Sequence, residues 1–535
     1  MPRYAYERLS AQDALFLWSE KPNQPMHVGA LAVLEAEPVK RVDGSIDIDC
    51  YRQRIESVLH WIPRYRQKLE WTPIEGWPVW VDDRQFDLGY HIRHIALPKP
   101  GTTEQLKEMA ARINARALDR RHALWEVWLI EGVAGGEQFA LLNKIHHCMI
   151  DGAAGADLSQ ILLSPSPRAE LDENVPYMPR PVPTQMELLR DSVALGISRP
   201  LRLLGNVFGA KDAKDHASGS ETSGKGEVKP RVDRPRIESR LRSLRDMLTE
   251  SLGSASPTPL NGELSPHRRL EWLTMPLDDV KELKGALDCT INDVVLATVT
   301  EAVRRYMFRR RVDHQRIDFR ISAPVSTRRP EHDRRQGNHV SSWVVRLPIE
   351  YEDPLTQLNE IRKLTSELKR SEASLAVDTL MEVAEWLPGP VLARGLGAVS
   401  SAGPVNMIVT NVPGPQFPLY MVGAKLLGLY PIVPLLPGGG LGVALFSYEG
   451  RLCWGFNGDY ELVPDLSAFV DDVRVAFENL RNAAVSAFMD RRTAPEERPD
   501  VLDLTQSALD SVEAEPGDEI EVEKAAAPAH ASAVA

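Results

Sequence analysis

The segment HHCMIDG (146–152) carries the clearest chemical signal in the chain. It follows a strand-like run, FALLNKI, and precedes a stretch of small residues, AAGADLSQILL, that resembles the start of a helix. An imidazole has an ordinary pKa of about 6.5 and can accept a proton at neutral pH. Reacting groups gather at the ends of scaffold elements, where ligands can reach them. The pattern therefore predicts a general base at the end of a strand.

Neighbouring residues of a strand point to opposite faces. Only one of His146 and His147 can then face a given cleft, and Cys148 would share the face of His146. The alternative is a pair of strand-end histidines that only form hydrogen bonds, followed by an Asp-Gly turn. A metal site is the weaker interpretation, because adjacent histidines diverge and the sequence has no second His-rich cluster to supply further ligands.

The elements that would position this motif mix two periodicities. Apolar residues at helical spacing predict helices, the first capped by Ser10 and ending near Trp18, the others at 47–62, 103–118, 277–287, 291–310 and 355–370. Apolar runs rich in Val, Ile and Leu predict strands at 27–35, 124–131, 138–147, 317–324, 339–347, 404–411, 440–448 and 451–457. Strands and helices alternate throughout, so the predicted class is α/β.

Composition narrows the class of protein further. The 535 residues exceed a usual single domain, and 43% hydrophobic with 26% charged residues is ordinary for a folded chain. Lys and Arg number 63 against 75 Asp and Glu, giving a net charge of −12. An acidic chain is a poor electrostatic match for a polyphosphate, so nucleic acid is not an expected partner.

Cysteine usage and the terminal sequence bear on the compartment. The four cysteines are far apart and form no CxxC pair, which argues against a disulfide framework and fits a reducing compartment. The N-terminal segment MPRYAYERLSAQD lacks the apolar core of a signal peptide. No helical apolar run of about 20 residues occurs, so we expect no membrane span.

The chain divides into four regions by pattern. Residues 1–165 and 266–490 are dense in strands and helices and are predicted to be two lobes. Residues 166–265 form a connector, in which 209–236 has few large apolar residues and is expected to be a flexible linker. Residues 491–535, acidic and then Ala-rich, are expected to be disordered.

Two apolar features have alternative interpretations. Residues 186–208 carry apolar side chains at helical period with arginines among them, which indicates either a helix packed on a domain surface or a basic amphipathic helix on a membrane. From Gly395 to Tyr448 the only charged residue is Lys425, and many prolines forbid a long helix. We favour buried strands with apolar loops there; a wall for an apolar substrate or a membrane surface is compatible with that.

Three further motifs have a structural and a functional interpretation. Thr290 and Asp293 are spaced as a capping box at the start of the 291–310 helix. Ser326, in the segment PVSTR, is either a turn hydroxyl or an oxyanion donor. Asn338 follows Gly337 and is a loop residue first and a functional one second.

HHCMIDG matches the HHxxxDG motif of the acyl-CoA-dependent acyltransferase superfamily, and the chain resembles its wax ester synthase/diacylglycerol acyltransferase branch. Similar stretches follow in order over about 1–165 and 266–480, namely LSAQDALFLWSE, PMHVGALAVLE, PRYRQKL, FDLGYHIRHIALPKPG, ALWEVWLIEG, TINDVVLA, APVSTR, GNHVSSWVVRLP, TNVPGP and GFNGDY. Their ordered combination is far more specific than any one of them. Ala123 stands where the family commonly has Pro, and the connector is long.

The resemblance implies two similar-sized lobes, each a mixed sheet flanked by helices, with a tunnel between them. It implies that His147 takes the proton from an acceptor hydroxyl as that oxygen attacks the thioester of acyl-CoA, help that is typically worth ~10²–10⁴ in rate. The thioester is a substrate, so no cofactor and no metal is expected.

The same resemblance assigns roles to the other candidates. Asn292 would donate a hydrogen bond near the thioester, and Asp151 would turn away from the cleft and pair with Arg328 to fix the loop. With His147, the expected catalytic set comprises His146, Asp151 and Asn292. The expected substrate-binding set comprises Gly152, Asp293, Ser326, Arg328 and Asn338.

The function implied is an O-acyltransferase that esterifies a diacylglycerol, a long-chain alcohol or both with a long-chain acyl group, making triacylglycerol or wax ester. Such a protein would be cytoplasmic and peripheral, at the inner membrane face or on lipid droplets. Two alternatives are a condensation-type enzyme that takes acyl groups from a carrier protein and a non-catalytic lipid-binding protein. An intact HHxxxDG argues against the latter, because a binder has no use for a base there.

Overall fold

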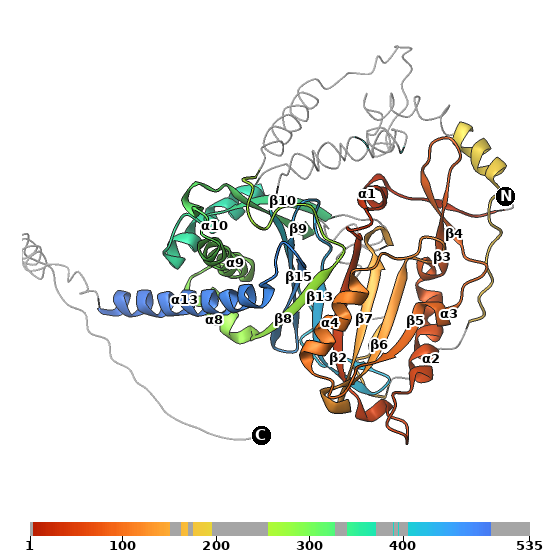
Figure 1. The fold of residues 1–535 in the computed structure, drawn as a ribbon, viewed down its shortest axis with the longest axis horizontal. Helices are drawn as coiled ribbons and strands as arrows, with labels where there is room; N and C mark the ends of the chain where they lie inside the picture. Colours follow the sequence, from red (N-terminus) through yellow and green to blue (C-terminus); the bar gives the residue numbers. More distant parts are fainter. Residues whose placement is uncertain are drawn as a thin grey trace, which may run out of the picture. The chain divides into compact units, whose positions relative to one another are not determined.

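The structure is a computed structural model that describes residues 4–149, 162–168, 175–194, 255–326, 340–370, 389, 394 and 405–493. Within these residues the strands form two six-stranded sheets and one three-stranded sheet. Helices flank both large sheets (Figure 1). The predicted α/β class, with two mixed sheets and flanking helices, is confirmed.

The first large sheet holds the strand that leads to the histidine pair. Its order is β12-β13-β2-β7-β6-β5. The bounds are Tyr420–Met421 for β12, Ala424–Ile432 for β13, His27–Glu35 for β2, Gln138–His146 for β7, Trp125–Val133 for β6 and Ile92–Ala96 for β5. Neighbouring strands run antiparallel except β5 and β6, which are parallel, so the sheet is mixed.

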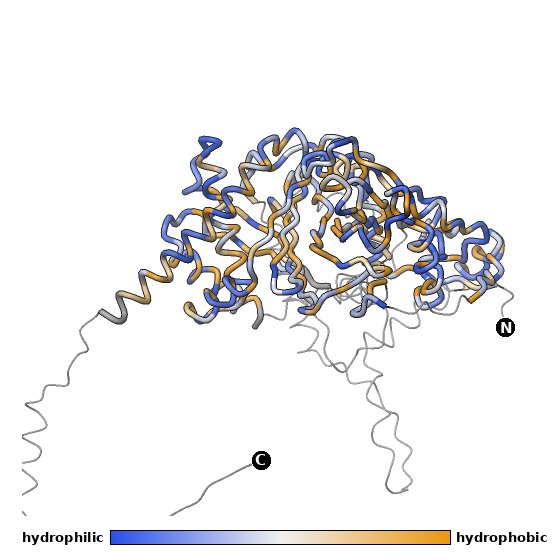
Figure 2. The backbone as a smooth tube through the Cα atoms, turned by 90° about the horizontal axis from the view of Figure 1, so that it is seen from below, coloured by the Kyte–Doolittle hydropathy of each residue, from blue (hydrophilic) through white to orange (hydrophobic). Residues whose placement is uncertain are grey.

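Each face of this first sheet buries apolar side chains against a helix. Helix α2 (Ile48–Val58) contributes Ile48, Tyr51 and Ile55 to the core on one face. A 3₁₀ turn at Leu59–Trp61 follows this helix directly. Helix α4 (Thr103–Asn114) contributes Leu106, Ala110 and Ile113 on the other face. Its N-terminus is closed by a capping box between Thr102 and Gln105. Hydrophobic stretches (orange) and hydrophilic stretches (blue) are interspersed along the backbone in Figure 2.

The second large sheet has the order β10-β9-β11-β14-β15-β8. The bounds are Val340–Leu347 for β10, Phe319–Ser326 for β9, Met407–Val412 for β11, Leu441–Tyr448 for β14, Arg451–Asp459 for β15 and Arg268–Pro276 for β8. Its core includes apolar residues of α8 (Leu277–Ala286), α9 (Ile291–Arg309), α10 (Pro354–Arg370) and α13 (Leu466–Thr493). Strand β11 pairs parallel with β9 and β14, so this sheet is mixed as well.

The third sheet, β1-β4-β3, supports the first helix. Strands β1 (Glu7–Arg8), β4 (Pro78–Asp82) and β3 (Gln67–Trp71) are antiparallel. Helix α1 (Ala11–Ser19) begins at Ser10, whose hydroxyl accepts the N–H of Asp13, as the sequence predicts. The buried face of α1 packs into a cluster with Trp77, Trp80 and Cys148, which lies next to the histidine pair.

Strand β13 links the two large sheets, because it follows β11 and precedes β14 in the chain yet pairs with β2 of the first sheet. This strand was not predicted from the sequence, because Pro431 near its end has no N–H to donate to a neighbouring strand. There β13 passes so close to β15 that a Cβ on Gly455 would lie 1.9 Å from the carbonyl oxygen of Pro431. Gly455 is therefore required by close backbone approach.

Where they are described, the charge-poor segment forms strands and the connector helix packs on the surface of a domain. Both agree with the structural interpretation given from the sequence. Of the charge-poor segment, β14 is almost entirely buried, whereas β11 and β13 mix buried with half-buried residues. Residues 185–194 are helical, and Leu188 is 1% exposed against Val79 and Val81 of β4. The rest of 186–208 and the predicted linker lie outside the described residues, as does the predicted tail after residue 493.

Candidate active site

Strand β7 carries the first histidine to a buried end. Phe139 and Leu141 face the α2 side, while Ala140 and Leu142 face the α4 side. Alternation therefore places His146 on the α4 side, and it is 0% exposed. Its register partner is His27, the first residue of β2. The chain then leaves the sheet, because His147–Met149 form a 3₁₀ turn.

His146 is committed to contacts inside the protein. Its Nδ1 accepts the backbone N–H of Cys148 at 3.2 Å and lies 3.0 Å from the Cys148 Sγ. Because Nδ1 accepts, a proton is assigned to Nε2, which faces Glu20 Oε1 at 3.6 Å. The prediction that Cys148 lies on the side of His146 is thus confirmed, although through a 3₁₀ turn instead of an extended strand.

Glu20 is a buried carboxylate at the C-terminal end of α1, with a side chain only 8% exposed. Burial raises the pKa of Glu20, but the contact with His146, the Met26 N–H at 3.1 Å and Arg120 outweigh it, and the pKa falls from the ordinary 4.5 to about 2. The Arg120 guanidinium donates to Glu20 Oε2 at 2.7 and 3.1 Å. The carboxylate is therefore ionised at neutral pH.

His147 occupies a different environment from its neighbour. Its backbone N–H donates to the carbonyl of Met26 at 2.9 Å. Its ring is half-buried and stacks on Phe16 of α1, with centroids 3.8 Å apart and planes 13° apart. The two histidines thus have separate partners, while the opposed directions predicted for two strand neighbours do not apply to His147, which lies in the 3₁₀ turn.

A second layer of polar groups lies behind the pair. Lys144, two residues before His146, is 1% exposed and donates to the carbonyls of Ile113 and Arg116 at the end of α4. Burial lowers the pKa of Lys144 to about 8. His27 Nε2 lies 3.0 Å from Asn114 Oδ1, and burial, with the charge of Lys144, lowers the pKa of His27 to about 3. His27 is therefore neutral.

The other described candidates lie at the start of α9. Thr290 and Asp293 form the predicted capping box, in which the Asp293 N–H donates to the Thr290 hydroxyl and Asp293 Oδ2 accepts the Thr290 N–H. Asp293 Oδ1 accepts the hydroxyl of Thr365 on α10 at 3.0 Å. Both oxygens of this carboxylate therefore have protein donors. Asn292 is half-buried in the first turn of the same helix.

Several predicted residues lie outside the described part of the chain. These are Asp151, Gly152, Arg328 and Asn338, so the expected pair of Asp151 and Arg328 stays a prediction. Ser326 is the last residue of β9, opposite Val340 of β10. The tunnel between the lobes also stays a prediction.

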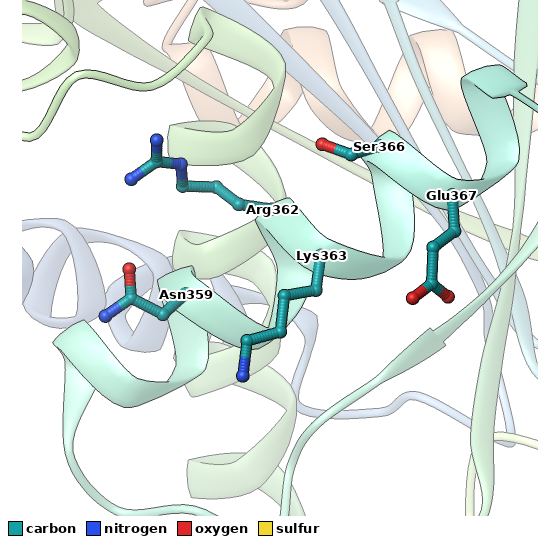
Figure 3. Close-up of a pocket in the computed structure, with 5 residues that line it drawn as sticks. All are labelled: Asn359, Arg362, Lys363, Ser366 and Glu367. Carbon is teal, nitrogen blue, oxygen red and sulfur yellow. The ribbon is translucent and has the colours of Figure 1, made fainter.

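One hollow in the described surface is lined only by α10, through Asn359, Arg362, Lys363, Ser366 and Glu367 (Figure 3). Lys363 pairs there with Glu360, and Arg362 donates to the carbonyl of Leu287. None of the predicted site residues lines it, so it is separate from the histidine pair. Within the described residues, no three His, Cys, Asp or Glu side chains are grouped as a metal site would require.

The sequence patterns indicate no role for Phe16, Glu20 or Arg120. Glu20 lies more than a hundred residues from His146, so no local spacing connects them. One signal was available. A carboxylate at the C-terminus of a helix is disfavoured by the helix dipole, so its presence after α1 indicates a compensating partner elsewhere.

Comparison with known proteins identifies the family. Residues 9–295 match the wax ester synthase/diacylglycerol acyltransferase catalytic domain, and residues 336–481 match the WS/DGAT C-terminal domain. The chain belongs to the wax ester synthase/diacylglycerol acyltransferase family. A relative from Mycobacterium tuberculosis, named as a probable diacylglycerol O-acyltransferase, is 33% identical over 482 residues, covering 88% of this chain and 95% of the relative.

Solved structures agree with the family at the level of the fold. The wax ester synthase/diacylglycerol acyltransferase from Marinobacter aquaeolei VT8 is 24% identical, with a TM-score of 0.60 over 89% of this chain and 99% of that one. The starter condensation domain of rhizomide synthetase is 14% identical, with a TM-score of 0.55 over 90% and 95% of the two chains. The predicted family, two-lobe fold and acyltransferase class are confirmed. Among the described helices, none is both long and apolar enough to cross a membrane.

Proposed function

We propose that this family member transfers a long-chain acyl group from acyl-CoA to the hydroxyl of a diacylglycerol, a long-chain alcohol or both. The products would be triacylglycerol or wax ester, with free CoA. Membership of the family supports the reaction class, and the name of the mycobacterial relative supports a diacylglycerol acceptor. The observation that carries the proposal is a half-buried imidazole, that of His147, held at the end of β7 by its backbone and its ring.

The proposed reaction is a single acyl transfer. The His147 imidazole takes the proton of the acceptor O–H as that oxygen attacks the thioester carbonyl. The C–S bond then breaks, and the leaving CoA thiolate takes the proton back from the imidazolium. Base help of this kind contributes ~10²–10⁴ in rate, and the positioning of the two substrates contributes further.

No covalent acyl-enzyme is needed in this scheme. Cys148, the nearest thiol to the histidine pair, is buried, and burial raises the pKa of its thiol well above the ordinary value. A thiol of this kind is a poor nucleophile, because the thiolate is the reactive form. Direct attack of the alcohol on the thioester therefore fits the site better than transfer through Cys148.

Asn292 and the pair of Asp151 and Arg328 keep the roles expected from the family resemblance. Asn292, exposed in part at the first turn of α9, is our candidate donor to the thioester. Asp151 and Arg328 are our candidate pair for fixing the loop after the histidines. His146 takes part through its contacts with Glu20 and Cys148 and not by direct proton transfer, because its ring is fully buried.

The test is an esterification assay with purified protein and labelled palmitoyl-CoA, offered with hexadecanol or dioleoylglycerol. Release of CoA together with ester supports the proposal. Turnover only with a carrier-bound acyl group would favour a condensation-type enzyme, and binding without turnover would favour a lipid-binding protein. Offering both acceptors in competition determines which is preferred.

Replacement of the proposed base should have the largest effect. His147→Ala is expected to lower kcat by roughly 10³-fold while the protein stays folded. His94→Ala is the matched control, because His94 is a surface histidine on β5 that pairs with Glu131. Turnover of the His147 variant at the level of the control would refute the assignment.

We further propose that the protein works peripherally at a membrane or lipid-droplet surface, where its apolar substrates are found. The connector supports this proposal, since Met186 and Val193 on the outer side of the 185–194 helix are 72% and 50% exposed. Deleting 186–208 should reduce co-sedimentation with anionic phospholipid vesicles more than it reduces turnover of a soluble acceptor. Equal sedimentation of both forms would rule out this role for the helix.

A further inference from the structure

Helix α1 reaches both histidines through two side chains one turn apart. Phe16 and Glu20 are spaced i and i+4, so they lie on the same side of the helix end. Phe16 stacks on the ring of His147, and Glu20 faces the ring of His146. One side chain in the last turn of α1 and one at its C-cap therefore contact the residue after β7 and the last residue of β7.

Glu20 also acts on the backbone of His147 through one intermediate residue. The Glu20 carboxylate accepts the N–H of Met26, and the carbonyl of Met26 accepts the N–H of His147. The segment between them, residues 20–26, is tied on its other side to the second lobe, because Gln24 donates to the carbonyl of Leu435. The position of the His147 backbone thus depends on where the carboxylate sits.

The helix that carries these side chains is itself firmly held. Ala11, Ala14 and Leu17 are buried in the cluster that contains Trp77 and Trp80. Arg120 joins the helix end to the segment after α4 by donating to the Leu17 carbonyl and to Glu20. A held helix can transmit a fixed orientation to the ring that stacks on it, as preorganised sites require.

The charges that face Glu20 come from several elements. The titratable groups there are His146 and Lys144 of β7, the neutral His27 of β2 and Arg120 after α4, with Asp13 of α1 close to Cys148. The carboxylate is the negative centre among mostly basic groups. Replacing it with an amide would keep an acceptor for Met26 but remove the charge that favours a protonated imidazole.

We infer that Phe16 and Glu20 are positioning residues for acyl transfer, through which α1 fixes the orientation of the His147 imidazole toward the acceptor hydroxyl. Neither residue gives or takes a proton in this scheme. Phe16 sets the plane of the ring, and Glu20 sets the backbone of His147 and the ring of His146. The inference rests on the proposed function of His147.

The test uses the esterification assay to compare a disruptive with a conservative substitution at each of the two positions. Glu20→Gln and Phe16→Leu are expected to lower kcat roughly tenfold, because small misplacements of a catalytic group are costly, and to change KM less than twofold. Glu20→Asp and Phe16→Tyr should recover much of the rate, since they retain the charge and the ring. In Glu20→Gln the acid limb of the kcat/KM profile should also move to lower pH, since the base loses a favourable negative charge.

Glu301→Gln is the matched control. Glu301 is a buried glutamate on α9, paired with Arg304, and the same substitution there should leave kcat and the pH profile unchanged. If the Glu20→Gln variant does not fold, the kcat of Phe16→Leu decides the test. Wild-type rates in both Glu20→Gln and Phe16→Leu, with His147→Ala inactive, would overturn this inference and leave the proposed function standing. An inactive wild-type protein would instead overturn the proposed function.

Discussion

Two buried carboxylates, Glu20 and Asp293, lie at opposite ends of two helices and serve different purposes. Asp293 lies in the first turn of α9; its contact with Thr290 closes the helix start, and its contact with Thr365 joins α9 to α10. Glu20 follows α1, and its partners His146, Met26 and Arg120 come from other parts of the chain. The first carboxylate completes its own helix, whereas the second organises the residues around the proposed base.

The difference indicates how to separate support from function near an active site. A carboxylate at a helix N-terminus is stabilised by the helix dipole and by the free N–H groups there, so it needs no further reason. A carboxylate at a C-terminus is opposed by the same dipole. The presence of Glu20 beside two histidines is better explained by its contacts with His146 and Met26.

The strongest test of this contrast uses the adjacent residues Asn292 and Asp293. Asn292→Ala is expected to lower kcat by about 10²-fold without changing stability, as loss of a donor to a developing oxyanion does. Asp293→Ala is expected to cost about 2 kcal/mol of unfolding free energy, since it breaks the cap and the bond to Thr365, with little loss of kcat. Urea unfolding and the esterification assay measure the two effects. A purely catalytic loss in Asp293→Ala would break the comparison.

The pH dependence of stability tests the role of Glu20, because its carboxylate is protonated at low pH. The folded-state pKa of Glu20 is about 2 against an ordinary 4.5, so its stabilisation is complete above pH 4.5 and is lost as the pH falls toward 2. The full effect is on the order of 3 kcal/mol, and the stability gap between wild type and Glu20→Gln should narrow by that amount across this window. Urea unfolding at a series of pH values gives the gap.

His27 provides a second, separable acid effect. Its folded-state pKa of about 3 lies below the ordinary 6.5, so the unfolded chain takes up a proton first as the pH falls, and stability declines from pH 6.5 toward 3. His27→Gln should remove that part of the pH dependence and leave the Glu20 window. A gap between wild type and Glu20→Gln that stays constant with pH would show that Glu20 is not a charged anchor.

Local patterns made much of the fold predictable. Ser10 caps α1 and Thr290 caps α9 because capping links residues three apart, and β2 runs from His27 to Glu35 as its apolar run indicates. Most other predicted strands and helices are present within a few residues. Helix α4 ends at Asn114, four residues before its predicted end, and the Lys144 ammonium donates to the carbonyls of Ile113 and Arg116 on either side of that end.

The rest could not be predicted because it depends on pairing between distant segments. Strand β8 was not predicted, because Arg268 and Glu271 interrupt its apolar pattern. Arg268 is nevertheless buried, where it forms an ion pair with Asp459. The partners of Glu20 were missed for the same reason, since no spacing rule reaches from residue 20 to residue 146. The alternation of β7 gives the side of the sheet on which His146 lies, but it does not reach His147, which lies in the 3₁₀ turn after the strand.

The membership of β13 in the first sheet has a consequence for how the chain can be divided. A fragment that ended before residue 405 would lack this strand, and β2 would then present an open row of backbone donors and acceptors along one edge. Unpaired edges of this kind recruit other chains and promote aggregation. The two halves therefore complement each other as pieces of one folding unit, and an expression strategy for either half should supply the other in the same cell.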